Sequence, residues 1–434
     1  MSVGDFAPAA LHAGYVTASI PGIGGTLKAR PEDFLVDEIP AYSPSGKGEH
    51  LYLFVEKRNL STPDVARILA RHFGVRHEAV GYAGMKDRVA ITRQLFSVHT
   101  PGRRPEDFPS LQHERVQVQW ADLHDNKLRL GHLQGNRFSV RVRGVGIEKV
   151  RAAMQSLRVL EREGVPNRFG VQRFGRAMNN HLVGRAIVRG DFDGAVREML
   201  APERATSETY ARAKEAFLAQ RYGDALDALP RTAHPERNVL RALMRGAAAR
   251  GAIKGLDRST KRFYISALQS AIFNDVLRQR LSEGTLGTLR EGDIAFKHDS
   301  RATFAVDRAV LDAPETPSRV GSLAISATGP MWGAHMRRPG GATLEAETAA
   351  LARSETTIEE LAAFEAQAPE LIEASRRSLR VAVTDTQIEA GLDEHGAYIR
   401  LAFDLPRGAY ATTVLDEIMK SPPASADEEE HEGG

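Results

Sequence analysis

An aspartate between two cations is the residue of this chain best suited to chemistry. In "GYAGMKDRVAITRQLFSV", residues 81–98, Asp87 follows Lys86 and precedes Arg88 among small residues. Such a carboxylate is either a turn residue, since Asp near Gly favours turns, or an ionised group able to act as a nucleophile. In extended backbone, neighbouring side chains point to opposite faces, so neither flanking cation faces Asp87. Lys28, in "TLKARPEDF", is the candidate for a cation that does.

Other motifs with chemical potential are weaker. The glycines of "PGIGG" (21–25) resemble a phosphate loop, as a nucleotide-dependent methyltransferase would need, but such a loop opens a helix and "TLKARPEDFLV" is extended in character. The 14 histidines show no HExxH or His-x-x-x-His spacing and cysteine is absent, so neither a metal site nor a cofactor is predicted. No "GxSxG" marks a serine hydrolase.

A basic stretch follows in the middle of the chain. Residues 231–262 contain nine Lys or Arg and only two acids. Arg237, Arg241 and Arg245 recur every four residues, so a helix would present them as one stripe. A stripe of this kind suits a phosphate backbone, and equally suits an ordinary solvated helix face.

The elements around Asp87 can be predicted from turn and periodicity signals. A helix should begin with Thr62 as its N-cap and Pro63 as its first residue, and end at Gly74. This helix would deliver the chain to Asp87, and "AITRQLFSV" would form the next strand. The other expected elements are strands within 26–40 and at 50–60, two strands about a Gly-containing turn within 126–145, helices over 147–163, 208–250 and 343–378, and strands at 379–384 and 397–404.

Length and composition predict two domains in a cytoplasmic protein. A chain of 434 residues exceeds what one core usually supports. Strands at both ends with a helix-rich middle suggest one domain inserted into another. The absence of cysteine fits a reducing compartment, and neither a signal peptide nor a membrane helix is apparent. The net charge is +2, but the last 14 residues hold five acids and no Lys or Arg, which leaves about +7 for the remainder; this tail should be disordered.

Five separated motifs resemble the TruD family of tRNA pseudouridine synthases. They are, in the family's order, "GTLKARPEDFLV", "GYAGMKDRVAITRQ", "KLRLGHLQGNRFSV", "GVPNRFGVQRFG" and "LPRGAYATTVLDEIM", and they extend over about residues 20–420. The resemblance implies a mixed α/β fold, with a pseudouridine-synthase catalytic domain built on a mixed, largely antiparallel sheet and an inserted α/β TRUD domain with a helical insertion. The implied boundaries are 1–192 and 380–420 for the catalytic domain, 193–379 for the insertion and 421–434 for the tail.

The family's functional positions map onto single residues of this chain. Asp87 matches the catalytic aspartate and Lys28 the basic residue that pairs with it. The resemblance implies isomerisation of uridine, notably uridine 13 of tRNA-Glu, by a monomer that needs tRNA but no cofactor, metal or membrane. Whether Asp87 attacks the ribose or assists a glycal-type intermediate stays open. The implied substrate-binding residues are Phe34, Lys86, Asn167, Phe169 and Tyr410.

Two features depart from the family's pattern. Tyr410 stands where close relatives have Phe, which keeps an aromatic face and adds a hydroxyl. The Arg-rich region at 205–250 is absent from the shortest members, and Arg237, Arg241 and Arg245 are its predicted RNA contacts. The alternative is a non-catalytic RNA-binding protein or RNA chaperone with the same fold. A binder of an anionic ligand has no need for Asp87 in the ligand's path, which favours the enzyme.

Overall fold

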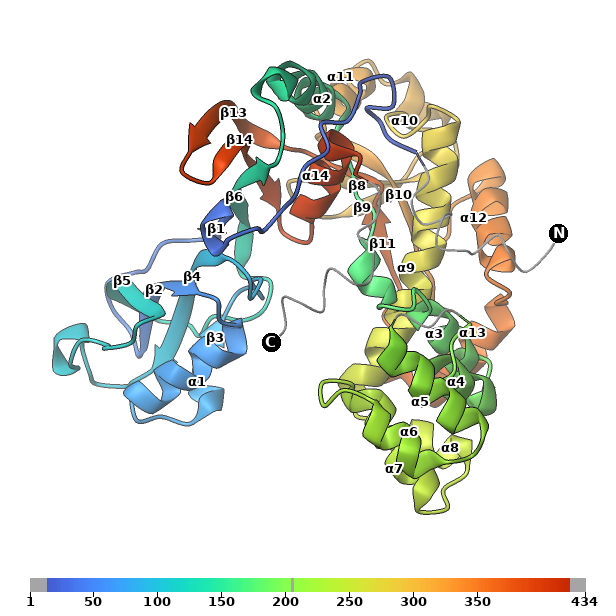
Figure 1. The fold of residues 1–434 in the computed structure, drawn as a ribbon. Coiled ribbons are helices and arrows are strands. Elements are labelled where there is room, and N and C mark those ends of the chain that lie inside the picture. Colours follow the sequence, from blue (N-terminus) through green and yellow to red (C-terminus); the bar gives the residue numbers. More distant parts are fainter. Residues whose placement is uncertain (1–13, 204–206, 422–434) are drawn as a thin grey trace. The chain divides into compact units, whose positions relative to one another are not determined.

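The computed structural model describes residues 14–203 and 207–421 (Figure 1). Apart from Ser421, the predicted disordered tail lies outside these ranges, and so do residues 1–13, within the N-terminal segment for which no signal peptide is predicted. None of the described helices combines the length and the apolar character needed to cross a lipid bilayer.

The chain divides into two compact units. The large-sheet unit comprises residues 17–165 and 381–421, and the inserted unit comprises residues 14–16 and 166–380. The chain therefore enters the inserted unit at Pro166, earlier than the boundary at 193 that the resemblance implies.

The large-sheet unit is built on one eight-stranded mixed sheet. Its strand order is β13-β14-β6-β1-β4-β2-β5, and β3 pairs with β4 beside this path. Only the β1–β4 pair is parallel among these described strands. The strands are β1 (Phe34–Pro40), β2 (His50–Arg58), β3 (Val80–Tyr82), β4 (Ile91–His99), β5 (Val116–His124), β6 (Leu133–Arg143), β13 (Thr384–Asp393) and β14 (Gly396–Pro406).

Helix α1 (Thr62–His72) covers one face of β2, β3 and β4 (Figure 1). Val65 and Leu69 on its apolar face are fully buried. The N-cap is Ser61, whose side chain forms a capping box with Asp64, so the prediction of Thr62 as N-cap was wrong by one residue. Thr62 is instead buried, because its hydroxyl bonds to groups of the sheet and of the segment before Asp87. The other helices of this unit are α2 (Val150–Glu163) and α14 (Ala411–Met419).

Only the second of the two strands predicted within 126–145 is present, as β6. Residues 126–132 form an irregular loop instead. The amide of Leu128 donates to Ser97 Oγ at 3.0 Å, and that of Gly131 donates to the carbonyl of Ala83 at 2.8 Å. These bonds tie the loop to β4 and to the residues after β3, so it does not pair with a strand of its own.

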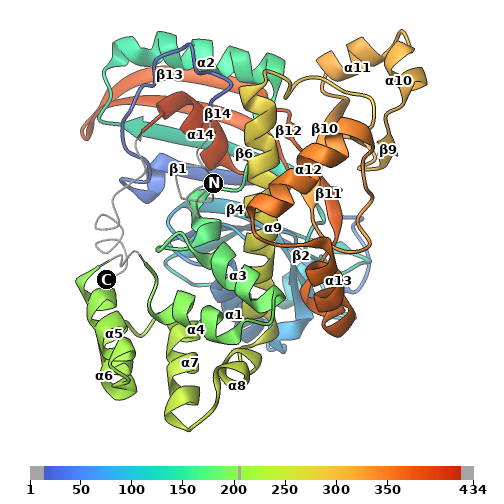
Figure 2. The same cartoon turned by 90° about the vertical axis from the view of Figure 1, so that its right-hand side faces the viewer.

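The inserted unit combines a small sheet with many helices. Helix α9 (Arg258–Ser282) is 25 residues long and runs past α3, α12 and β10 (Figures 1 and 2). The sheet has the order β11-β10-β8-β9, with β8 (Ile294–Lys297), β9 (Thr303–Ala305), β10 (Ile325–Met331) and β11 (Ser375–Ser378). The remaining helices are α3 (Asn180–Val188), α4 (Phe192–Leu200), α5 (Glu208–Leu218), α6 (Tyr222–Ala228), α7 (His234–Met244), α8 (Ala249–Lys254), α10 (Arg308–Asp312), α11 (Thr316–Gly321), α12 (Gly341–Arg353) and α13 (Ile358–Gln367).

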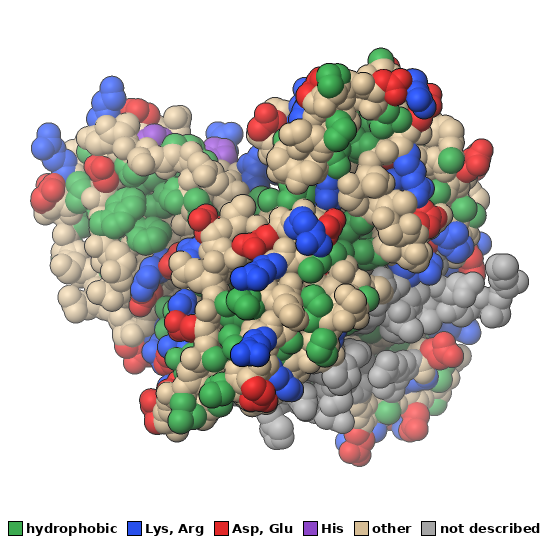
Figure 3. Space-filling model, turned by 90° about the horizontal axis from the view of Figure 1, so that it is seen from above, with side chains coloured by type: hydrophobic (Ala, Val, Ile, Leu, Met, Phe, Trp, Pro, Cys, Tyr) green, Lys and Arg blue, Asp and Glu red, His purple; other side chains and the backbone are tan. Residues whose placement is uncertain are grey.

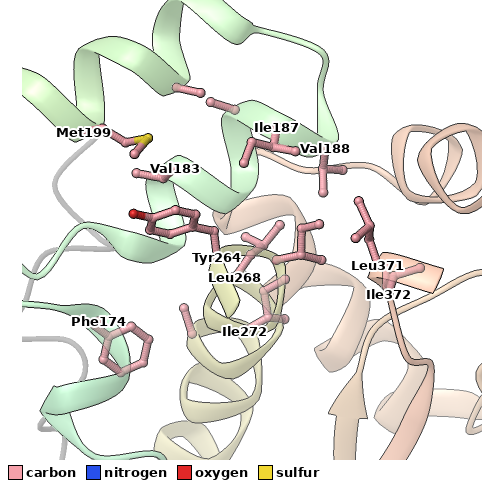
Figure 4. Close-up of a cluster of buried hydrophobic side chains, with 14 of the residues drawn as sticks. Phe174, Val183, Ile187, Val188, Met199, Tyr264, Leu268, Ile272, Leu371 and Ile372 are labelled. Atoms are coloured by element: carbon pink, nitrogen blue, oxygen red, sulfur yellow. The ribbon is translucent and has the colours of Figure 1, made fainter. Parts of the chain in front are cut away.

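The core of the inserted unit gathers around α9. In Figure 4, Leu268 and Ile272 of α9 lie among Val183 and Ile187 of α3, and Leu371 lies beside them. These side chains are at most 7% exposed. Burial of this apolar surface is the main stabilising contribution to such a core.

Two short strands mark the places where the chain passes between the units. β7 (Val165–Pro166) pairs with β12 (Arg380–Val381) in a two-stranded sheet.

Candidate active site

Asp87 lies in an irregular segment between β3 and β4. Its Oδ2 is 3.1 Å from Nζ of Lys28, and its side chain is 51% exposed. The carboxylate is therefore open to solvent within this unit. A half-exposed ion pair of this kind stabilises a fold by about 0–1 kcal/mol.

Lys28 adopts a backbone conformation that is uncommon for its type. Its φ is 56°, in the left-handed region that favours glycine. The loop is held by reciprocal backbone hydrogen bonds between Thr26 and Arg143, at 2.9 and 3.0 Å. A strained residue of this kind persists only where its surroundings fix it, and here the result is an ammonium group directed at Asp87.

Phe34 lies beneath this ammonium group. Nζ of Lys28 is 4.7 Å from the ring centroid, within cation–π distance. The ring is 1% exposed and meets Phe138 edge to face, with 6.4 Å between centroids. Phe34 therefore positions Lys28 in this structure, and its ring has little exposed face for a base.

Lys57 is a further site residue that the sequence reading missed. Its Nζ donates to the backbone carbonyls of Asp87 at 2.7 Å and Leu60 at 2.6 Å, and the residue is 1% exposed. Burial lowers the pKa of Lys57 to about 8, against the opposing effect of the Asp87 charge. One signal was available in the sequence: Lys57 occupies the same face of β2 as the apolar Leu53 and Val55.

The ammonium group of Lys86 has buried partners of its own. Its Nζ is 2.9 Å from Oε2 of Glu38, and both side chains are buried. Asn136 Oδ1 accepts a second hydrogen bond from the same Nζ. Burial lowers the pKa of Lys86, and the Glu38 charge opposes this effect. Its ammonium group thereby anchors the segment that carries Asp87. Substrate binding by Lys86 stays a prediction.

Thr62 and Gln94 fix the same segment from its other side. The hydroxyl of Thr62 accepts from the amide of Lys86 at 2.9 Å and donates to Oε1 of Gln94 at 3.0 Å. Gln94 Nε2 in turn donates to the carbonyl of Gly84 at 3.0 Å. Side chains from α1 and β4 thus hold residues 84–87 through their backbone.

Tyr410 belongs to the same unit as Asp87. It is the N-cap residue of α14 and is 39% exposed. Its carbonyl accepts a hydrogen bond from the Thr413 hydroxyl at 2.6 Å. The aromatic ring is thus attached to a fixed helix end and stays partly accessible.

Asn167 and Phe169 lie in the inserted unit. Asn167 Nδ2 donates to the Ser378 carbonyl at 2.9 Å, and its Oδ1 accepts from Arg377. Phe169 is 6% exposed, meets Phe273 edge to face at 5.6 Å, and has the guanidinium of Arg377 at 4.4 Å from its ring centroid. The structure thus brings together four of the predicted site residues, Lys28, Phe34, Lys86 and Asp87. The contacts of Asn167 and Phe169 described above are all with residues of the inserted unit.

Two members of the predicted arginine stripe, Arg237 and Arg241, lie on α7, and Arg245 is the C-cap residue of that helix. Nη1 of Arg237 donates to the carbonyls of Leu226 and Leu229, at 2.6 and 2.8 Å, so it caps the end of α6. Arg241 and Arg245 are exposed. On the face drawn in Figure 3, Lys and Arg side chains are interspersed with Asp and Glu. Within residues 14–203 and 207–421, no group of three or more His, Asp or Glu side chains is arranged to hold a metal ion.

Comparison with known proteins identifies the family. A family model described as tRNA pseudouridine synthase D (TruD) matches residues 10–418. Proteins named tRNA pseudouridine synthase D from Geotalea daltonii and Geobacter sulfurreducens are each 42% identical to this chain, over 94% of it and over 99% and 97% of the relatives. A crystal structure of a protein assigned as TruD from Methanosarcina mazei matches with a TM-score of 0.79 at 28% identity, over 97% of this chain and 99% of that one.

The fold and these matches define an isomerase with a mixed α/β architecture, which confirms the fold class and enzyme class predicted from sequence. Within that class, the chain belongs to the tRNA pseudouridine synthase D (TruD) family.

Proposed function

We propose that this protein converts uridine in tRNA to pseudouridine and that Asp87 is its catalytic carboxylate. The observation that carries the proposal is the Asp87–Lys28 pair, 3.1 Å apart, in which the Asp87 side chain is half-exposed. Its segment is held by bonds from Lys57 and Thr62, although so exposed a pair adds little to stability. A fixed, accessible carboxylate beside a cation is what attack on a ribose carbon requires.

The reaction needs no electron acceptor. The bond between C1′ and N1 of uridine breaks, the uracil turns, and a bond forms between C1′ and C5. The proton on C5 is lost and N1 takes up a proton, so the product is an isomer of the substrate. Asp87 acts beside C1′, either by attack or by assisting a glycal-type intermediate, and both routes need its ionised form. Lys28 places a positive charge 3.1 Å from this carboxylate.

The target base must leave its stack to reach Asp87, at a free-energy cost of a few kcal/mol. Stacking on aromatic rings offsets about 1–3 kcal/mol per base. We assign this role to Tyr410, a residue that is 39% exposed. The resemblance also assigns uridine contacts to Phe34, Asn167 and Phe169. Asn167 retains one N–H donor and one acceptor position beyond its bonds to Ser378 and Arg377.

The sequence resemblance also supports a particular substrate, uridine 13 of tRNA-Glu, with the cytoplasm as the place of action. Mapping pseudouridine in a tRNA-Glu transcript after incubation with the protein tests this choice. A transcript with cytidine at position 13 should remain unmodified.

Asp87→Asn provides the main test, because asparagine keeps the shape and removes the charge. We expect kcat to fall by at least about 1,000-fold, with the Kd for tRNA changed less than about threefold. Asp37→Asn is the matched control, since Asp37 is also in a half-exposed ion pair, with Arg93. Full activity of Asp87→Asn would refute the assignment. Wild-type protein that binds tRNA but forms no pseudouridine would favour the RNA chaperone.

A further inference from the structure

An open surface cavity lies on the large-sheet unit, apart from the residues around Asp87. Its volume is about 580 Å³, within the range of about 300–1,000 Å³ typical of small-ligand sites. No carboxylate is part of its described lining. The lining side chains are Tyr42, His124, Asn126, Lys127, Arg129 and His132.

Tyr42 supplies an aromatic face that the fold holds in place. Its ring is 37% exposed and stacks on His124, with 5.1 Å between centroids and 24° between planes. Its hydroxyl lies 3.1 Å from Nδ1 of His132 and 3.4 Å from the hydroxyl of Tyr52. Tyr52 is fully buried and donates to the carbonyl of Asn126 at 2.8 Å. The Tyr42–His124 stack is therefore supported by the buried hydroxyl group of Tyr52.

Two cations stand beside the aromatic stack on the 126–132 loop. Nζ of Lys127 donates to the carbonyl of Glu78, which fixes the ammonium group and leaves its other two N–H donors for a ligand. Arg129 is exposed, and in the described chain no acid lies within ion-pair distance of it. Leu128 between them is buried, so both cations are attached to a loop that packs firmly onto the sheet.

This combination matches one ligand chemistry. An exposed aromatic ring stacks on a nucleobase, and Lys and Arg without acidic partners bind a phosphate. We propose that the cavity binds one nucleotide of an RNA strand, with its base on Tyr42 and its phosphate at Lys127 and Arg129. The proposal rests on the proposed function and extends it by a second RNA contact.

The cavity and Asp87 are approached from opposite faces of the sheet. Tyr52 and Lys57 are five residues apart on β2, so their side chains project to opposite faces. Tyr52 supports the cavity, whereas Lys57 bonds to Asp87. The nucleotide in the cavity is therefore not the target uridine, and its loss should weaken binding without slowing the chemical step.

Substitution of Tyr42 tests the stacking contact. We expect Tyr42→Leu to raise the Kd for tRNA about 5- to 50-fold, with kcat at saturating tRNA within twofold of wild type. Tyr42→Phe keeps the ring and should bind nearly as wild type. Tyr42→Leu with unchanged affinity for tRNA would overturn the proposal. Because Asp87→Asn tests the chemistry separately, that result would leave the proposed function standing.

Substitution of the cations is independent of the stack. Lys127→Ala with Arg129→Ala should reduce the slope of log Kd against log salt by about 1–2. Arg103→Ala with Arg104→Ala removes two exposed cations elsewhere on the unit and should leave the slope unchanged. If the two double variants give the same slope of log Kd against log salt, the phosphate contact is contradicted.

Adenosine and uridine monophosphates distinguish a free nucleotide from RNA. If the cavity serves RNA, millimolar mononucleotide should compete weakly with tRNA for wild type but not for Tyr42→Leu. Saturable mononucleotide binding that leaves tRNA affinity unchanged would assign the cavity to a free nucleotide and reject an RNA contact.

Discussion

Lys57 brings an ammonium group into the interior of the large-sheet unit and bonds it to backbone carbonyls. In the described chain, no carboxylate lies within ion-pair distance of its Nζ, and one acceptor is the carbonyl of Asp87. A buried cation with this arrangement is costly unless its hydrogen bonds are complete. We infer that Lys57 is a positioning residue, which fixes the backbone of Asp87 while Lys28 faces its side chain.

The positioning role predicts a loss of kcat in variants of Lys57. Lys57→Met leaves the Asp87 carbonyl without its donor, and a displacement of about 1 Å can reduce the rate about 100-fold. Lys57→Arg keeps a charged donor and should retain more activity.

The same variants carry a pH signature that a general packing defect would not produce. The nearby charged groups, Asp87, Lys86 and Asp64, are common to wild type and variants. The pKa of Lys57 is about 8 in the folded protein and near 10.5 when unfolded, so between these values the unfolded chain binds more protons. Wild-type stability should therefore rise relative to Lys57→Met, by about 2 kcal/mol from pH 7.5 to 10. Urea denaturation measures this, and parallel pH curves would contradict it.

At the scale of elements, α7 carries arginines with two different tasks. Arg237 bonds to carbonyls at the end of α6, as cations near helix C-termini commonly do. Arg241 and Arg245 are exposed and are free of that task. A test of RNA binding by α7 should therefore change these two and leave Arg237 in place.

Reversal of the two exposed arginines should weaken tRNA binding and flatten its salt dependence. Arg241→Glu with Arg245→Glu should reduce the slope of log Kd against log salt by about 1–2, with kcat unchanged at saturation. Arg212→Glu with Arg221→Glu, on exposed positions of α5 and just before α6, is the control for charge reversal. If both pairs weaken binding equally, the effect belongs to net charge and not to α7.

The elements that could be predicted are those set by local signals. α1 followed from Pro63, its apolar spacing and Gly74, and the strand after Asp87 followed from its β-rich composition. The loop at 126–132 could not be predicted, because its partners Ser97 and Ala83 lie far away in the sequence. Ser61 is the N-cap instead of Thr62, because the Thr62 hydroxyl donates to Gln94 of the sheet.

The part of the candidate site in which two charged side chains face each other could be predicted from the sequence. The part in which a side chain bonds to a backbone carbonyl could not. A cation other than Lys86 was expected to face Asp87, and Lys28 lies there at 3.1 Å. Lys57 bonds a carbonyl 30 residues away, and no pattern of side chains marks such a contact. Phe34 was expected against the base, but the sequence does not reveal that Lys28 lies over its ring.

At the scale of the whole molecule, each unit has a core of its own. The buried cluster around α9 consists of residues 169–379, all within the inserted unit. The clusters beneath α1 and behind Tyr52 consist of residues 51–133 in the large-sheet unit. A segment with its own contiguous core can in principle fold alone.

Residues 166–380, expressed alone, should therefore fold cooperatively. They form one continuous segment. On the N-terminal side they lose the packing of Val16 against the core, the contact of the Arg168 guanidinium with the Tyr15 ring at 5.5 Å, and one long hydrogen bond from Arg168 to the Gly14 carbonyl at 3.3 Å. The fragment should give a single thermal transition by circular dichroism. It should form no pseudouridine, because it lacks Asp87, but should keep the part of the salt-dependent tRNA binding that Arg241 and Arg245 supply. A fragment without a cooperative transition would mean that this core depends on the large-sheet unit, and the two units would then be one folding unit.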